Sequence, residues 1–176
     1  MRMRRIAAAL AVLILAPATG STGLTVLGHS PELTPLAFLA GSCWHGPFPD
    51  GQKIDSHCFR WFQDGQYLRD RNELIGSDPP YGGEATYYWD HSRKTIAYTY
   101  WANDGGMSVG TVVTSSDVIA FPDEQYTGKE GTMRLRSEIR PTGNPNEFQR
   151  KVWVIGQDGS ETPISNAIYV RKPLNW

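Results

Sequence analysis

Short runs of alternating apolar and polar residues occupy most of the chain after Gly41. No window beyond that point sustains the 3.6-residue period of a helix, whereas runs rich in Tyr, Trp, Val, Ile and Thr recur between turn residues. The pattern predicts about ten β-strands. They cover residues 41–46, 53–63, 66–75, 83–90, 95–102, 107–114, 118–122, 132–140, 147–155 and 163–172.

Tight turns are predicted between many of these strands, because pairs of turn residues separate them and can supply the positive φ that hairpins need. These pairs are Asp50-Gly51, Asp64-Gly65, Asp104-Gly105, Gly143-Asn144 and Asp158-Gly159. The one helical signal is a short turn that begins at Ser30-Pro31-Glu32 and ends near Leu39. Sequential hairpins without a covering helix must stack as a sandwich or close. We expect an all-β fold, an up-and-down antiparallel barrel with a short N-terminal helical turn.

The first residues have the features of an export signal. Three arginines, Arg2, Arg4 and Arg5, precede an apolar run from Ile6 to Leu15, and small residues follow at positions 16–18. A buried helix or a membrane anchor is the alternative. We expect a signal peptide at 1–18, a flexible lead-in at 19–30 and one barrel domain at 31–176. The mature chain would have no stable membrane span and would be periplasmic or secreted.

The charge and composition exclude several classes of protein. Lys and Arg number 17 against 18 for Asp and Glu, and removal of residues 1–18 takes away three of the arginines and no acidic residue. A mildly acidic chain does not suit the phosphate backbone of a nucleic acid. The six tryptophans and eight tyrosines exclude a disordered segment, and two cysteines are too few for a disulfide-built miniprotein.

Alternation assigns faces to several strands. His57, Phe59 and Trp61 share one face of the second strand. In the eighth strand, Ser137 lies on the apolar face that also carries Met133, Leu135 and Ile139, and in the last strand Asn166 shares a face with Ile164, Ile168 and Val170. Polar residues on apolar faces are typical of a ligand cavity or of a hydrogen-bonded core.

The third strand has charges on both faces. Arg69, Arg71 and Glu73 alternate with Asp70 and Asn72. One face must point into the barrel, which predicts a polar interior there. Arg69 or Arg71 would hold a ligand carboxylate if their face points inward; the alternative is a solvated outer ladder.

The segment 36–46, Leu-Ala-Phe-Leu-Ala-Gly-Ser-Cys-Trp-His-Gly, resembles the opening strand of lipocalin-like (calycin) β-barrels, in particular small bacterial exported domains of that type. This chain has one residue more between the glycine and the tryptophan. The resemblance implies that Trp44 lies at the closed end of the barrel under a basic side chain near the last strand, for which Arg171 is the match. It also implies a small apolar or amphipathic ligand in the barrel.

Haem-binding barrels of the nitrobindin type begin with a similar segment. Those proteins hold iron through a histidine late in the barrel, and this chain has no histidine after His91. We therefore expect no cofactor, unless His57 or His91 takes that role.

The two cysteines are expected to form a disulfide. If Asp50-Gly51 centres the first hairpin, Cys43 lies opposite Cys58. Closing so short a loop would stabilise the fold by about 3 kcal/mol. The alternative is a zinc site that includes His45 and His57, but alternation places His57 on the opposite face from Cys58.

The pattern Gly-Met-Ser-Val-Gly at 106–110 matches the G-x-S-x-G of serine hydrolases. Because β-branched residues follow it and no helix does, we interpret the match as coincidental and assign no catalytic residue.

Three functions fit these observations. The first is an exported barrel that binds a small apolar or amphipathic molecule, with lining from Phe59, Trp61, Tyr87, Trp89, Tyr98, Tyr100, Arg69 and Arg71. The second is an enzyme on the same scaffold that uses Asp70, Glu73 and His57. The third is a structural or interaction module of the cell envelope. A cavity with buried polar groups would favour the first function, and a filled interior would favour the third.

Overall fold

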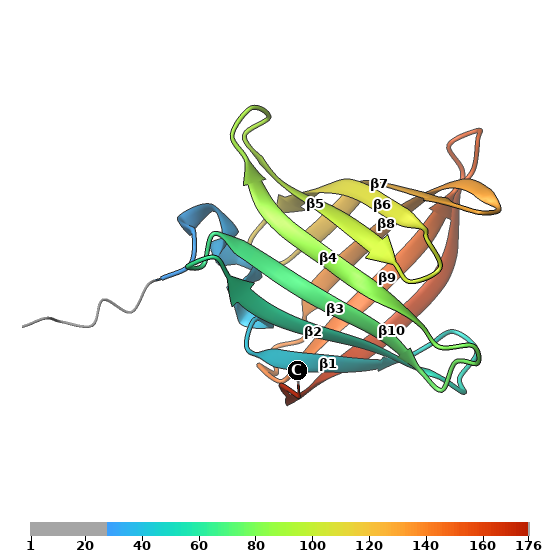
Figure 1. The fold of residues 1–176 in the computed structure, drawn as a ribbon, viewed down its shortest axis with the longest axis horizontal. Helices are drawn as coiled ribbons and strands as arrows, with labels where there is room; N and C mark the ends of the chain where they lie inside the picture. Colours follow the sequence, from blue (N-terminus) through green and yellow to red (C-terminus); the bar gives the residue numbers. More distant parts are fainter. Residues whose placement is uncertain (1–27, 176) are drawn as a thin grey trace, which may run out of the picture.

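A computed structural model describes residues 28–175; the predicted signal peptide at 1–18 and residues 19–27 of the predicted lead-in lie outside the described part. Ten antiparallel strands form one closed barrel in which each strand pairs with its neighbours in sequence (Figure 1). The strands are Ser42–Pro47 (β1), Ile54–Phe62 (β2), Tyr67–Ile75 (β3), Tyr81–Asp90 (β4), Thr95–Ala102 (β5), Met107–Thr114 (β6), Ile119–Gly128 (β7), Gly131–Pro141 (β8), Glu147–Ile155 (β9) and Glu161–Pro173 (β10).

The predicted fold class is confirmed. The first strand pairs with both the second and the last, so the sheet has no free edge. Gly51 and Gly159 have the positive φ expected of the turns that contain them. The main difference in strand length is in β7, which continues past Pro122 to Gly128. A register shift between Phe121 and Glu124 accommodates the proline, which cannot donate a backbone hydrogen bond.

A 3₁₀ helix, Pro31–Leu39 (η1), closes one end of the barrel. Its residues Leu33, Leu36 and Leu39 are buried, and the helix lies at the opposite end from the β1–β2 and β7–β8 connections (Figure 1). The segment just before it is also in contact with the barrel, because His29 stacks on Trp61 with ring centroids 4.8 Å apart. Burial of this apolar face makes the helix end of the barrel a solid core.

Trp44 and Arg171 meet at this closed end, as the resemblance implied. They are direct partners across β1 and β10, and the guanidinium carbon lies 4.4 Å from the centroid of the indole ring. The Trp44 indole donates a hydrogen bond to the carbonyl of Leu39 at 3.0 Å, and Arg171 donates to the Ser42 hydroxyl at 2.8 Å. The fully buried indole thus joins the helix to the sheet.

The predicted disulfide is present between Cys43 and Cys58, which face each other across β1 and β2. Because both sulfur atoms are bonded, neither is available as a zinc ligand. His57, next to Cys58 in β2, lines the barrel cavity instead. Within residues 28–175, no helix has the length and apolar character needed to cross a membrane.

One assignment of faces was wrong. Ile168 and Val170 were placed on the apolar face of the last strand, but they are 42% and 38% exposed, whereas Ala167 and Tyr169 are buried. A bulge between Pro163 and Ser165 shifts the register of β10 against β9 and so exchanges the two faces. Asn166 therefore lies on the outer face.

Replacement of Arg171 by alanine is expected to lower the free energy of unfolding by about 2–3 kcal/mol, since it removes the cation over Trp44 and the hydrogen bonds to Ser42 and to the Phe38 carbonyl. Denaturant unfolding measures this change. Lys172→Ala, at the exposed neighbouring position, is the matched control and should change stability by less than about 0.5 kcal/mol. Equal effects of the two substitutions would contradict the role given to Arg171.

Candidate functional site

A cavity of about 990 Å³ occupies the barrel between the closed end and the opposite rim. Residues of the β1–β2 and β7–β8 connections line the cavity together with the strands, so the cavity extends to the rim. Its volume lies at the upper end of the range for pockets that hold drug-sized molecules. The interior of the barrel is therefore not filled by side chains.

Tyrosines on the cavity wall lie flat against glycines of neighbouring strands. A Cβ added at Gly110 would be 2.6 Å from the Tyr98 hydroxyl, and one added at Gly46 would be 2.7 Å from the ring of Tyr169. These glycines face the tyrosines or lie diagonally to them in the sheet, and the absence of a side chain leaves room for the ring. Such packing fixes the direction of each phenol.

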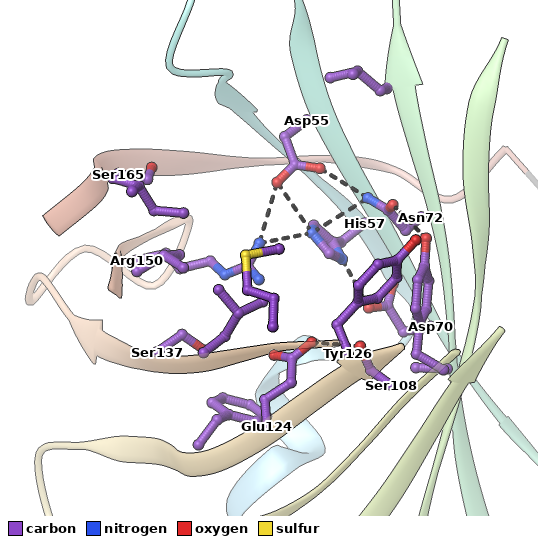
Figure 2. A pocket seen from close by; sticks show the side chains of 18 of the residues that line it. Asp55, His57, Asp70, Asn72, Ser108, Glu124, Tyr126, Ser137, Arg150 and Ser165 are labelled. Atoms are coloured by element: carbon purple, nitrogen blue, oxygen red, sulfur yellow. Dashed lines mark hydrogen bonds and ion pairs between the residues drawn. The ribbon is translucent and has the colours of Figure 1, made fainter. Parts of the chain in front are cut away.

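A cluster of charged side chains lies on one wall of the cavity (Figure 2). His57 Nδ1 donates to Asp70 Oδ2 at 2.7 Å, and its Nε2 lies 3.3 Å from Asp55 Oδ2. Arg150 Nη1 donates to the same Asp55 oxygen at 3.1 Å, and the Tyr169 hydroxyl donates to it at 2.5 Å. The four charged residues come from β2, β3 and β9, so barrel closure brings them together.

Asn72 and Tyr100 hold this cluster in place. The Asn72 amide donates to Asp55 Oδ1 at 2.8 Å and to the Ser56 carbonyl at 3.2 Å. Its own oxygen accepts a hydrogen bond from the Tyr100 hydroxyl at 3.3 Å. Both Asp55 oxygens therefore have donors, and the carboxylate is fixed in orientation.

The protonation states follow from the charges. Burial lowers the pKa of His57, but Asp70 and Asp55 outweigh burial and raise it to about 10. Burial raises the pKa of Asp55, while His57, Arg150 and the Tyr169 hydroxyl hold it well below its ordinary value. Arg150 Nη1 is 3.0 Å from His57 Nε2, so the two cationic groups lie side by side, and both converge on Asp55. Two cations and two carboxylates leave this cluster without net charge.

A second polar group lies on β6 and β7, with Glu124 across the view from Asp55 (Figure 2). Ser108, on β6, donates to Glu124 Oε1 on β7 at 2.8 Å. Ser108 is the serine of the G-x-S-x-G pattern, and it lies within a strand and not on a strand-to-helix turn. The two glycines of that pattern leave space for the rings of Tyr126 and Tyr98.

Two buried polar atoms on the cavity wall make no hydrogen bond of normal geometry among the described residues: Asp70 Oδ1 and the Tyr98 hydroxyl. The Tyr98 hydroxyl lies close to the Glu124 carboxylate, so Asp70 Oδ1 is the atom that lacks a neighbouring partner. Asp70 is 3% exposed and Tyr98 is 5% exposed. Buried polar groups are ordinarily paired, so an unpaired one in a cavity needs an explanation. Within the described residues, no group of three or more His, Cys, Asp or Glu side chains is placed to hold a metal ion.

Comparison with known proteins adds evidence on the fold alone. No protein-family model and no curated protein matches the chain. Among solved structures, the barrel is similar to the crystal structure of Rv2717c from M. tuberculosis, with 18% sequence identity and a TM-score of 0.50. The match covers 82% of this chain and 99% of the other.

The predicted ligand-binding residues separate into three groups. Phe59, Tyr87, Tyr98 and Tyr100 line the cavity. Trp61 and Trp89 pack against the core and do not line it. Asp70 and Asn72 line the cavity. Alternate residues of a strand point to opposite faces, so Arg69 and Arg71 lie on the outer face of β3. Arg69 instead lies 4.6 Å from the centroid of the Phe62 ring and 3.7 Å from Glu84.

The residues proposed for acid–base chemistry are also divided. His57 and Asp70 are hydrogen-bonded to each other inside the barrel, whereas Glu73 is exposed on the outer face of β3. His91, an alternative haem ligand, is exposed at the turn between β4 and β5. Both ring nitrogens of His57 already contact neighbouring side chains.

Sequence reasoning did not assign a role to Asp55, Asn72, Glu124, Arg150 or Tyr169. A signal was present for Arg150, since it lies between Phe148 and Val152 on the apolar face of its strand. Glu124 gave no signal, because the strand that carries it was expected to end at Pro122.

The charge on His57 predicts how stability depends on pH. Because its pKa in the folded chain is raised to about 10 from an ordinary 6.5, His57 stabilises the fold fully below about pH 6.5 and loses that effect as the pH rises through 10. The free energy of unfolding, measured by denaturant titration, should therefore fall from pH 7 to 10. The His57→Gln variant should lack most of this slope, and His91→Gln should keep it. A flat profile for the unmodified protein would contradict the assignment.

Proposed function

We propose that the protein binds a small amphipathic molecule inside the barrel. The observation that carries the proposal is a cavity of about 990 Å³ whose wall contains a buried acceptor, Asp70 Oδ1, that has no donor among residues 28–175. Apolar side chains such as Phe121, Leu135 and Ile139 line the same space. A molecule with one polar end and an apolar body matches both kinds of surface.

The expected export of the chain is part of this proposal. An N-terminal segment typical of a signal peptide and a disulfide between Cys43 and Cys58 both suit an oxidising compartment outside the cytosol. The lipocalin-like resemblance of the segment 36–46 supports ligand binding in the barrel. The barrel has ten strands, whereas lipocalins have eight, so the resemblance supports the proposal only through the shared principle of a ligand inside a barrel.

The two other functions have less support. A structural module would be favoured by an interior filled with side chains, and this barrel contains a cavity of about 990 Å³ instead. An enzyme would need a base open to its substrate, and the Nε2 of His57 faces Asp55 and Arg150. Ligand binding is therefore the function that the geometry supports best.

Native mass spectrometry of the protein purified from its own host tests the proposal directly. A reproducible added mass of a few hundred daltons, lost on denaturation, is the expected result. Reproducibly unliganded protein would count against binding of an abundant host molecule.

A second test blocks the cavity. Ser137 is buried on the cavity wall, so Ser137→Trp places an indole in the space where the ligand would lie. Binding of the fluorescent apolar amine N-phenyl-1-naphthylamine should weaken by about tenfold or more, a loss of about 1.4 kcal/mol. Gln125→Trp adds the same indole to the outer face of the neighbouring strand β7 and should leave binding unchanged. Equal binding to all three proteins would place the probe outside the barrel.

A further inference from the structure

We propose that the polar end of the ligand is an organic ammonium group, held inside the cavity between Asp70, Glu124 and a cluster of aromatic rings. This inference rests on the proposed function, because it names the chemical class of the molecule that the cavity would take. Three independent observations carry it: the charge of the lining, the unpaired acceptor and the aromatic surroundings.

The charge of the cavity wall is negative. Among the lining residues, five are acidic and three are basic when His57 is counted as charged. In the interior, His57 and Arg150 balance Asp55 and Asp70. Glu124 remains, and the groups beside it are the neutral hydroxyls of Ser108 and Tyr98. One added positive charge would neutralise the interior, and an added negative charge would increase the imbalance in a medium of low dielectric constant.

The unpaired atom of Asp70 is an acceptor. One oxygen of Asp70 accepts from His57, and the other has no donor within residues 28–175, although the side chain is only 5% exposed. An ionised carboxylate can only accept hydrogen bonds, so the missing partner must be a donor. An ammonium N–H supplies such a donor together with the compensating charge. A carboxylate or phosphate ligand would supply neither.

Aromatic rings surround the same region. Tyr87 is central to them: its ring centroid lies 5.4 Å from that of Tyr98, 6.3 Å from that of Phe121 and 6.4 Å from that of Phe59. Aromatic faces attract cations, and clusters of this kind hold ammonium groups in other proteins. Phe59 lies directly opposite Asp70 in the pairing of β2 with β3, and both side chains line the cavity, so the aromatic cluster and the Asp70 carboxylate share one part of the wall. Burial raises the pKa of the Tyr87 hydroxyl, and the negative charge of Asp70 raises it further, against the opposing effect of Arg150.

The apolar residues of the cavity wall would contact the rest of the ligand. Leu74, Met133, Leu135 and Ile164 lie on strand ends nearer the open rim than the aromatic cluster. An apolar body attached to the ammonium group would lie along them and extend towards the rim. The ligand would therefore enter with its cationic end first.

Three probes with the same ring system test the inference: 1-naphthylmethylamine, which is cationic at pH 7, the neutral 1-naphthylmethanol and the anionic 1-naphthylacetate. Isothermal titration should give an affinity for the amine about tenfold or more above that for the alcohol, with the acid the weakest. Equal affinities for the amine and the alcohol, or tightest binding of the acid, would overturn the inference.

Glu124→Gln removes the uncompensated charge and keeps an oxygen that can accept from Ser108. The preference for the amine over the alcohol should fall by about fivefold to tenfold in this variant, while the alcohol binds as before. Asp70→Asn is the second variant and should also reduce the preference. Glu73→Gln, on the outer face of β3, is the matched control and should keep it. A preference that persists in both interior variants would contradict the assignment of these carboxylates.

The probes also separate this inference from the proposed function. Suppose that the alcohol and the amine bind the unmodified protein with equal affinity and both lose binding in the Ser137→Trp variant. In that case the cavity binds ligands but does not select for a cation. If none of the three probes binds and the host-purified protein carries no added mass, both proposals fail.

Discussion

The pairing of β1 with β10 is the contact on which the rest of the structure depends. It closes the sheet, so every strand has two neighbours, and it places Trp44 beside Arg171 at the helix end. An eight-stranded barrel has an interior just wide enough for its own side chains to fill or for one small ligand. Ten strands enclose a wider interior, and the helix η1 fills only one end of it. The cavity is therefore a geometric consequence of strand number and closure.

Closure also sets the electrostatics of the interior. Charges that face inward lose water, so each needs a partner of opposite sign or a donor. Asp55 has such partners in Arg150, Tyr169 and Asn72, which come from three different strands. The same requirement is not met on the side of Asp70 Oδ1, where the structure supplies an acceptor without a donor. The two carboxylates therefore differ: Asp55 is held on both oxygens, and Asp70 is held on one, which is why the proposed ligand contact is placed at Asp70.

Most of the architecture could be predicted from the sequence, because alternation and turn residues are local signals. The disulfide followed from the same reasoning, since the centre of the first hairpin determines which residues face each other. The errors arose where a local irregularity changes which residues of a strand face inward, or where the strand ends. The bulge near Ser165 exchanged the faces of β10, and Pro122 was interpreted as a strand end although a shift in register lets β7 continue.

The site was harder to predict than the fold for a physical reason. Both faces of β3 carry charges, so hydrophobic patterning cannot decide whether Arg69 or Asp70 points inward. That choice depends on the partners supplied by other strands: His57 donates to Asp70 inside, and Glu84 lies near Arg69 outside. Pairings between β2, β3 and β9 are long-range properties, and a single strand pattern contains no information about them. Arg150 was visible as an exception to its apolar face, but its partners were not.

The presence of buried charged residues in the cavity wall is itself a reason to infer a function for the cavity. Well-packed apolar side chains in place of a buried ion pair often leave a protein as stable or more so. The contribution of His57 to stability is therefore not by itself a reason for charged residues at this place in the barrel. What the cluster provides is orientation, because hydrogen bonds from Asn72 and Tyr169 fix Asp55, and His57 fixes one oxygen of Asp70. A ligand would meet an acceptor that is already desolvated and aligned, so little ordering would remain to oppose binding.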